Sequence, residues 1–316
     1  MTVGIAIALY NGARFVEAQL DSLRLQTCPA DQVVLCDDGS KDNTVSIVRR
    51  YIEKHDLYGR WQLHINEENL GYSKNFYKAM SLCNTDLIYM CDQDDLWKAD
   101  KLEKMNAVMA QRQDISLLLC KGGVIDAKGE ALHGILIEQS HETGAITAVT
   151  PAQVLRTLSW TGMLMCVRRD FLMQWQEKLY PARAPHDFAL ALCAADKGAF
   201  YTYDYVGAFH RRHGNNTANE EHRIFKMLNL KNKLRDMNAY NRYLEQLLDA
   251  ALPLSEDTLC MLDYRLEKAQ ARELSLRQRK LRSLLKVYSS DRSGLLRPVS
   301  LLCDIWLLLF GDRSEL

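Results

Sequence analysis

The chain has 316 residues, of which 47% are apolar, and it carries 40 basic and 40 acidic residues, so its formal net charge is +0. The length and apolar content allow one large or two ordinary domains around a substantial core, and the balanced charge argues against nucleic acid as a partner. The 9 cysteines are scattered without a CxxC pair, which predicts buried thiols in a reducing compartment rather than disulfides or a zinc site.

The first hundred residues alternate between apolar strands and helices. The expected strands cover residues 3–9, 32–36, 61–65 and 86–91, and the expected helices cover residues 14–25, 44–52 and 73–83. Apolar strands separated by helices predict an α/β fold with a mostly parallel sheet covered on both faces. The first strand follows no basic segment and is too short for a signal peptide, so we expect a cytoplasmic protein.

The later part of the chain changes in character twice. Between residues 98 and 222 the pattern is less regular, with strands expected at 115–120, 163–167 and 199–209 and a helix at 188–197. After about residue 222 glycine nearly disappears, and long helices are expected at 224–251 and 256–288. We therefore predict a domain at residues 1–222, with halves at 1–97 and 98–222, and a helical region at 223–316.

The stretch Asp92–Asp95 places three carboxylates within four residues, directly after an apolar run that ends at Cys91. Crowded carboxylates repel one another and are pushed toward their protonated forms, and a divalent cation removes this conflict. Hard oxygen ligands are those that Mg²⁺, Mn²⁺ or Ca²⁺ prefer. The stretch therefore predicts a metal site at the carboxyl edge of the sheet, with Asp92 and Asp94 as ligands.

Polar clusters follow every one of the first four strands, at Tyr10-Asn11, Asp37-Asp38, Asn69–Gly71 and Asp92–Asp95. Ligands of parallel sheets bind outside the carboxyl ends of the strands, so these clusters predict one binding edge, although loops are often polar for other reasons. The chain has neither a G-x-G-x-x-G after the first strand nor a G-x-x-x-x-G-K-[ST]. This argues against a dinucleotide dehydrogenase and a P-loop NTPase.

Asp187 is the best-placed candidate for a catalytic base, because it stands at the predicted start of a helix. The helix dipole favours the ionised carboxylate there, which can then accept a proton from an attacking hydroxyl; a plain helix cap is the alternative. His213 is a candidate third metal ligand. Its neighbours favour a phosphate-binding loop and comprise Arg211, Arg212, Asn215 and Asn216.

The carboxyl-terminal region combines basic and apolar segments. Residues 264–297 carry ten Lys or Arg against three Asp or Glu, and residues 295–310 are apolar apart from Arg297, Ser300 and Asp304. The apolar segment is too short for a confident membrane span. A basic helix followed by such a segment predicts an interfacial anchor on an anionic membrane, and an ordinary packed helix is the alternative.

In their order and spacing these motifs resemble family 2 glycosyltransferases. The stretches that carry the resemblance are Ala6–Gly12, Asp37–Thr44, Asn69–Gly71, Asp92–Trp97, His186-Asp187 and Arg211–Asn216, so it covers residues 1 to about 220. Each motif is weak alone, whereas the ordered set is specific. The form D-Q-D-D-L-W at Asp92–Trp97 is most similar to the rhamnosyltransferase type that builds bacterial surface polysaccharides.

The resemblance implies a GT-A fold and an inverting transfer from a nucleotide-diphosphate sugar, with donor binding in residues 1–97 and catalysis in residues 98–222. It implies that Asp187 is the base and that Asp92 and Asp94 hold Mn²⁺ or Mg²⁺. It also places His213 on the metal, with His210 as the other candidate. The implied donor residues are Ala8, Tyr10, Asn11, Asp38, Gly71, Lys74 (or Asn75), Asp92 and Gln93, and the implied acceptor residues are Trp160, Gly162 and Asp95.

The resemblance also implies the partners. The expected donor is dTDP-rhamnose, with UDP-Glc, UDP-Gal and UDP-GlcNAc as alternatives, and the expected acceptor is a lipid-linked glycan at the inner face of the cell membrane. A homodimer is left open. The rival classes are a non-catalytic nucleotide-sugar-binding module, a nucleotidyltransferase, which would bring a glycine-rich basic loop after the first strand, and a glycoside hydrolase, which uses two carboxylates without a nucleotide-binding edge.

Overall fold

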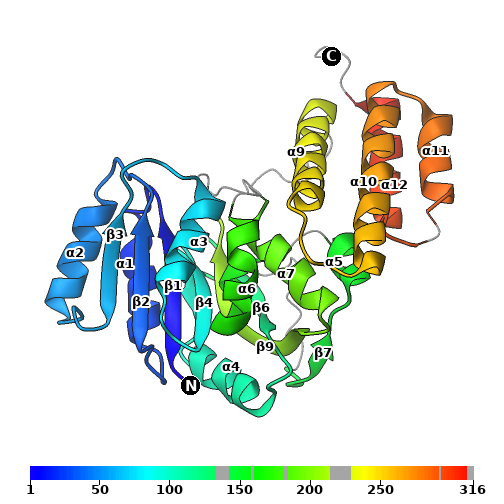
Figure 1. Ribbon diagram of the computed structural model, residues 1–316. Helices are drawn as coiled ribbons and strands as arrows, with labels where there is room; N and C mark the ends of the chain where they lie inside the picture. Colours follow the sequence, from blue (N-terminus) through cyan, green and yellow to red (C-terminus); the bar gives the residue numbers. More distant parts are fainter. Residues whose placement is uncertain (133–141, 158–159, 181–183, 214–228, 292, 312–316) are drawn as a thin grey trace. The chain divides into compact units, whose positions relative to one another are not determined.

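The computed structural model describes residues 1–132, 142–157, 160–180, 184–213, 229–291 and 293–311 (Figure 1). By their contacts these residues form two compact units, one of residues 1–149 with 160–212 and one of residues 150–159 with 213–316. The predicted boundary at residue 222 lies outside the described residues. A short segment from the middle of the chain joins the second unit, which the sequence analysis did not anticipate.

The first four strands form the parallel part of the sheet, in the order β3-β2-β1-β4. The elements in chain order are β1 (Val3–Leu9), α1 (Val16–Arg24), β2 (Gln32–Asp37), α2 (Thr44–Lys54), β3 (Trp61–Ile65), α3 (Tyr72–Leu82) and β4 (Leu87–Asp92). Each matches an expected element within about three residues at either end. The predicted parallel α/β architecture is confirmed.

The order of these strands decides which face each helix covers. The chain moves outward in one direction from β1 through β2 to β3 and then returns to pair β4 with β1. Because parallel crossovers are right-handed, α1 and α2 cover one face and α3 covers the other. In Figure 1, α3 accordingly lies in front of the strands while α1 lies behind them. The carboxyl ends of the strands are left uncovered as a common edge.

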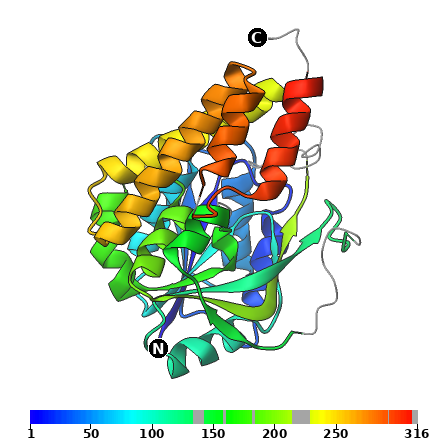
Figure 2. The same cartoon turned by 90° about the vertical axis from the view of Figure 1, so that its right-hand side faces the viewer.

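The second half of the first unit extends the sheet with mixed pairing. Its elements are β5 (Leu96–Trp97), α4 (Lys101–Gln111), β6 (Leu117–Ile125), β7 (Ile146–Ala148), the 3₁₀ turn η1 (Gly162–Leu164), β8 (Met165–Arg168), α6 (Arg169–Leu179), α7 (His186–Asp196) and β9 (Phe200–Arg211). In the described part of the chain, the sheet continues from β4 as β8-β6-β9-β5, with β7 also on β9. Figure 2 shows the long strands β6 and β9 side by side, and they pair in parallel.

One strand here was not expected. Leu96 and Trp97 pair antiparallel with Phe209 and Ala208, and a helix begins at Lys101. The tertiary pairing with β9 overrides the local pattern, since two residues carry too little periodicity to declare a strand.

The core of the first unit is built from the apolar strands and the inner helix faces. Ile5, Ile7, Leu35 and Tyr89 are among its fully buried side chains. The predicted buried thiols are present, since six cysteines are buried in the described residues, although Cys260 in the second unit is exposed.

The second unit is helical. It contains α5 (Pro151–Thr157), α9 (Leu230–Asp249), α10 (Glu256–Arg277), α11 (Leu281–Ser289) and α12 (Pro298–Phe310). The prediction of one helix over residues 256–288 is wrong, because the chain breaks between α10 and α11. Arg279 takes a left-handed φ of 51° there, and the amide of Lys280 donates to the carbonyl of Ser275 to close the turn. Such a reversal ends a helix.

A buried ion pair lies inside this helical unit. Asp304 of α12 is fully buried, and its carboxylate accepts from Arg272 Nε at 2.5 Å and from Arg272 Nη2 at 2.8 Å. The hydroxyl of Tyr288 donates to the same carboxylate at 2.9 Å. Asp304 therefore faces the other helices, although it interrupts an apolar segment. In the described ranges no helix combines the length and the apolar character needed to span a bilayer.

We expect Asp304→Asn to lower the free energy of unfolding of the helical unit by about 3–5 kcal/mol, because it leaves the buried Arg272 guanidinium without its counter-charge. Urea unfolding followed by circular dichroism measures the loss. The double variant Arg272→Met with Asp304→Leu removes both charges and should be more stable than Asp304→Asn. Equal stability of Asp304→Asn and the unmodified chain would contradict this account.

Candidate functional site

The predicted binding edge exists at the carboxyl ends of β1, β2 and β4. Strand register sets Ala8 beside Asp92 on one side and beside Cys36 on the other, and Leu9 lies beside Asp37. Tyr10 follows directly and is 48% exposed. The edge thus brings Ala8, Tyr10 and Asp92 together, three of the residues predicted to bind the donor.

Gln93 joins two loops of this edge. Its side-chain oxygen accepts from the backbone amide of Tyr10 at 2.9 Å, and its side-chain nitrogen donates to the Tyr10 carbonyl at 2.8 Å. A Cβ on Gly12 would lie 2.2 Å from the Gln93 amide oxygen, so a larger residue there would displace the Gln93 side chain. The predicted role of Gln93 in donor binding stays a prediction. In the structure its amide fixes the backbone that presents Tyr10.

A second set of hydrogen bonds fixes the loops after β1 and β2. Asn11 has a left-handed φ of 50°, a conformation that asparagine tolerates. Its backbone amide donates to the Ser40 hydroxyl, and its side-chain oxygen accepts from the amide of Lys41. The Asp37 carboxylate accepts from the Ser40 hydroxyl and amide. Asn11 therefore acts on the loops, and any donor contact it makes stays a prediction.

Asp38 is almost fully buried and ties β2 to the loop before α3. One carboxylate oxygen accepts from the Leu70 amide and from the Asn66 side chain, both at 2.8 Å. The other oxygen accepts from the amide of Gly71 at 2.9 Å, where a φ of 81° requires glycine. Both Asp38 and Gly71 lie at the predicted edge, with the Asp38 oxygens already engaged by protein donors.

The two candidates for phosphate contact differ in their surroundings. Asn75 is buried, and its amide donates to the carbonyl of Cys36 while accepting from Asn66. Lys74 is partly exposed, and its ammonium lies 5.5 Å from the centre of the Tyr180 ring. A pocket of about 480 Å³ lies over residues 68–74 and includes Lys74. Between the two, the structure favours Lys74 as the residue open to a ligand.

The carboxylate of Asp95 is fully buried and joins the acidic stretch to β9. One of its oxygens lies 3.0 Å from His210 Nδ1 and accepts from the backbone amide of Arg211 at 2.9 Å. The Arg211 side chain in turn donates to the carbonyl of Asp94 at 2.8 Å. Asp95 was predicted as an acceptor residue, but the structure makes it the partner of His210.

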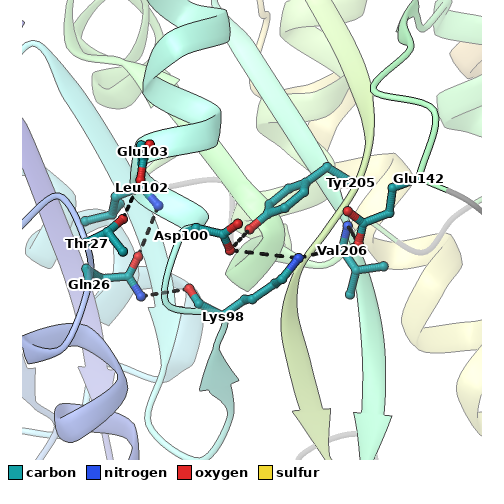
Figure 3. A network of polar contacts seen from close by, with 9 residues as sticks. All are labelled: Gln26, Thr27, Lys98, Asp100, Leu102, Glu103, Glu142, Tyr205 and Val206. Atoms are coloured by element: carbon teal, nitrogen blue, oxygen red, sulfur yellow. Dashed lines mark hydrogen bonds and ion pairs between the residues drawn. The ribbon is translucent and has the colours of Figure 1, made fainter.

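A polar network holds the segment that follows the acidic stretch. Figure 3 shows its side chains: Gln26, Thr27, Lys98, Asp100, Glu103, Glu142 and Tyr205. The Tyr205 hydroxyl of β9 donates to Asp100 at 2.6 Å, and Gln26 donates to the Lys98 carbonyl at 2.9 Å. The start of α4 is thus bound both to β9 and to the loop after α1. This keeps β5 paired with β9 and Asp95 beside His210.

Negative charge is concentrated at this point. Burial raises the pKa of Asp92 well above its ordinary value, and the charges of Asp95 and Asp94 raise it further. Burial alone would lower the pKa of His210, but the hydrogen bond to Asp95 and the nearby carboxylates raise it to about 9. Protonated His210 is one cation at this point, and a metal ion would relieve the remaining repulsion among the carboxylates of the acidic stretch. Among the described residues, no group of three or more His, Cys, Asp or Glu side chains is arranged for a metal.

Asp187 lies in the first turn of α7, after Pro185 at the N-cap, so it is not the cap itself. Its carboxylate accepts from the amide of Phe188 at 2.8 Å. Burial raises the pKa of Asp187 to about 6, against the amides of Phe188 and Gly162, which lower it. The charge of Asp187 also adds slightly to the rise in the pKa of Asp92.

Gly162 was predicted on the acceptor side and lies against Asp187. A Cβ on Gly162 would lie 2.9 Å from His186 Nε2 and 3.6 Å from Asp187 Cβ. His186 is buried and stacks on Phe76 with ring centres 4.2 Å apart. Burial lowers the pKa of His186 to about 3, so its ring is neutral. This apolar packing is what excludes water from one side of Asp187.

The sequence analysis missed Lys101. It is fully buried, its ammonium donates to the Met163 carbonyl at 2.6 Å, and it lies 3.4 Å from the Trp97 ring centre. Because Met163 adjoins Gly162, Lys101 connects the segment after the acidic stretch to the segment beside the base. Buried lysines are rare, and no local pattern marks this one out.

Two more predicted residues have different surroundings. Trp160 packs edge-on against Phe200 with ring centres 5.0 Å apart. His213 is buried and groups by its contacts with the second unit rather than with the sheet. Of the two histidines considered for the metal, His210 is the one beside the acidic stretch. Asn215 and Asn216 of the predicted phosphate loop lie outside the described residues.

We expect Asp95→Asn to lower the pKa of His210 from about 9 to its ordinary value of about 6.5 or below, because burial then acts without the opposing charge. An NMR titration of the histidine ring measures the change, with His210→Gln identifying the signal. Asp100→Asn removes a carboxylate bound to Tyr205 instead and is the control. An unchanged His210 pKa in Asp95→Asn would contradict the pairing.

Comparison with known proteins finds a family match for the first half of the chain. Residues 4–151 match the family described as Glycosyl transferase family 2. A glycosyltransferase of Nostoc sp., alr2836, is 25% identical over 68% of this chain and 66% of its own length. The dTDP-rhamnosyl transferase RfbG of Shigella flexneri is 34% identical over 31% of this chain and 34% of its own length. The chain thus spans from about a third to about two thirds of these relatives.

Solved structures agree on the fold. The S. aureus TarS 1-349 structure in complex with UDP-GlcNAc has a TM-score of 0.58 at 18% identity, over 93% of this chain and 92% of that one. The mannosyltransferase PcManGT from Pyrobaculum calidifontis, in complex with GDP-Man and Mn²⁺, has a TM-score of 0.56 at 16% identity, over 98% and 88%. The chain has a GT-A fold, and its residues 4–151 match the model of glycosyl transferase family 2.

Proposed function

We propose that this protein transfers a sugar from a nucleotide-diphosphate donor to a glycan hydroxyl with inversion at the anomeric carbon. The observation that carries the proposal is the meeting of Asp187 with the acidic stretch at the sheet edge. Asp187 lies beside Gly162 of η1, and η1 packs against β4, which ends at Asp92. This packing supports one site with a base and an acidic cluster. The family match of residues 4–151 supports the same activity.

Asp187 would act as the base. A hydroxyl of the acceptor attacks the anomeric carbon from the side opposite the leaving diphosphate, so the bond to the sugar forms as the bond to the diphosphate oxygen breaks. The carboxylate takes the hydroxyl proton as the attack proceeds. One base suffices, and no protein nucleophile is needed. The apolar packing of His186 and Gly162 against Asp187 supports this role, because it raises the proton affinity of the carboxylate.

Asp92 and Asp94 would hold Mn²⁺ or Mg²⁺, and the cation would stabilise the negative charge of the departing nucleotide diphosphate. Two carboxylate donors suit a hard cation that takes its other ligands from phosphate and water. The raised pKa of Asp92 supports this assignment, since the site carries more negative charge than it can hold alone. His210, held by Asp95, lies beside this charge, and His213 stays the other candidate.

For the donor we propose dTDP-rhamnose, on the strength of the D-Q-D-D-L-W motif and of the partial similarity to RfbG. A UDP-hexose is the second candidate, because the similar TarS structure holds UDP-GlcNAc. Ala8, exposed Tyr10 and Lys74 would contact the donor, and Trp160 would line the acceptor side. We propose a lipid-linked glycan of a bacterial surface polysaccharide as the acceptor.

A donor screen tests the activity. Purified protein with Mn²⁺ or Mg²⁺ and a membrane extract should release a nucleoside diphosphate from one of several nucleotide sugars, and a chelator should abolish the release. Asp187→Asn should slow turnover by about 10²–10⁴-fold, because the base is lost, while nucleotide binding measured by calorimetry persists. Asp196→Asn, at the far end of the same helix, is the matched control and should retain activity.

The outcomes separate the competing classes. Nucleotide-sugar binding without release of a nucleoside diphosphate, under every condition, would mean a non-catalytic binding module. Full turnover in Asp187→Asn would show that another group is the base.

The proton affinity of the base predicts a pH dependence. Asp187 must be ionised to accept a proton, and its pKa is about 6. The turnover rate should therefore be constant above pH 7 and fall as the pH drops through about 6, approaching tenfold per pH unit below it. Rates measured between pH 4.5 and 8.5 at saturating donor give the profile. Full activity down to pH 5 would exclude a base with this pKa.

A further inference from the structure

Helix α12 turns its apolar residues outward. Its exposed large side chains are Val299, Leu302, Trp306, Leu309 and Phe310, each between 38% and 70% exposed. Trp306 and Phe310 lie together, with ring centres 5.9 Å apart. At 100° per residue these five positions occupy one side of the helix. We refer to them as the outer face of α12.

The opposite side of α12 is fixed inward by specific contacts. Asp304, the one charged residue of the helix, bonds the buried Arg272, and Leu307 and Leu308 pack with Leu230 and Leu234. Rotating the helix to bury its outer face would break the ion pair and expose these leucines. The apolar outer face is therefore a stable feature of the folded unit.

The exposed charges near the outer face have one sign. Within described residues 280–311, the exposed charged side chains are Lys280, Arg282, Lys286 and Arg297. Of the two acidic residues of that range, Asp304 is buried and Asp291 is partly exposed and hydrogen-bonded to its neighbours. Asp304 pairs with Arg272, and Asp291 accepts from the Ser293 hydroxyl at 2.6 Å and from the Leu296 amide at 2.7 Å.

A pocket brings the basic and the apolar residues together. It has a volume of about 570 Å³, and both Leu285 and Lys286 of α11 line it, as do Pro298 and Leu301 of α12. Lys286 and the start of α12 thus share one wall. One of the four cations, Lys286, therefore lies beside apolar residues at the start of α12.

We propose that the outer face of α12 docks onto an anionic lipid bilayer, with the surrounding lysines and arginines at the level of the phosphates. Exposed leucine, tryptophan and phenylalanine next to basic residues fit the boundary between headgroups and acyl chains. A second copy of the chain would bring the same four cations against themselves, which like charges oppose. This charge argument selects the bilayer over self-association.

Vesicle sedimentation with the full chain tests the proposal without donor or acceptor, so its result is independent of the transferase activity. The protein should bind vesicles of phosphatidylcholine with phosphatidylglycerol more tightly than vesicles of phosphatidylcholine alone. Leu302→Ser with Trp306→Ser should weaken binding about tenfold or more, because apolar area is lost. Lys280→Ser with Arg282→Ser should weaken only the phosphatidylglycerol-dependent part, about fivefold for each charge.

Tyr58→Ser with Met173→Ser removes two exposed apolar residues of the first unit and is the matched control, with vesicle binding unchanged. All exchanged residues are exposed, and circular dichroism checks that each variant is folded. Failure to bind either vesicle, or full binding by Leu302→Ser with Trp306→Ser, overturns the proposal. So does a dimer in sedimentation velocity that this variant converts to a monomer, which would assign the face to a second copy.

Discussion

The buried carboxylate of Asp95 is the constraint on which the rest of the site depends. It ends the parallel half of the sheet and binds the backbone and the histidine ring of β9, so it joins two strands that the sequence separates by more than a hundred residues. From the same segment, Lys101 reaches the Met163 carbonyl, which adjoins the glycine packed against the base. A few buried polar contacts thus connect the acidic stretch, β9 and the segment beside Asp187.

Much of this fold follows from the sequence because β1, β2 and β4 are nearly continuous apolar runs bounded by polar residues. Val3–Leu9 and Trp61–Ile65 begin and end as expected, and the polar ends of the strands meet at one edge. What could not be predicted depends on tertiary pairing. Leu96–Trp97 becomes a strand only because β9 lies beside it. Lys101 is buried against its usual preference.

The site residues likewise divide into those that the sequence predicts and those that depend on tertiary structure. The acidic stretch and Asp187 stand out in the sequence because their residue types carry chemistry at recognisable positions. The choice between His210 and His213 depends on where β9 ends, and residues three apart in sequence leave the strand in different surroundings. In the helical region, Asp304 looked like an interruption of an apolar segment, yet it marks the inner side of α12. The hydrophobic pattern of a helix predicts its buried side only when the residues on that side are apolar.

The loop held by Asp38 has a consequence for engineering a different donor preference. Both oxygens of this carboxylate already accept from the loop before α3. Exchanging Asp38 would therefore displace the backbone of that loop before it altered any contact with a nucleobase. Tyr10 differs, because its side chain is exposed while Gln93 holds its backbone from both sides. Libraries that vary the side chain at Tyr10 and keep Asp38, Gln93 and Gly71 constant would therefore explore specificity on an unchanged scaffold.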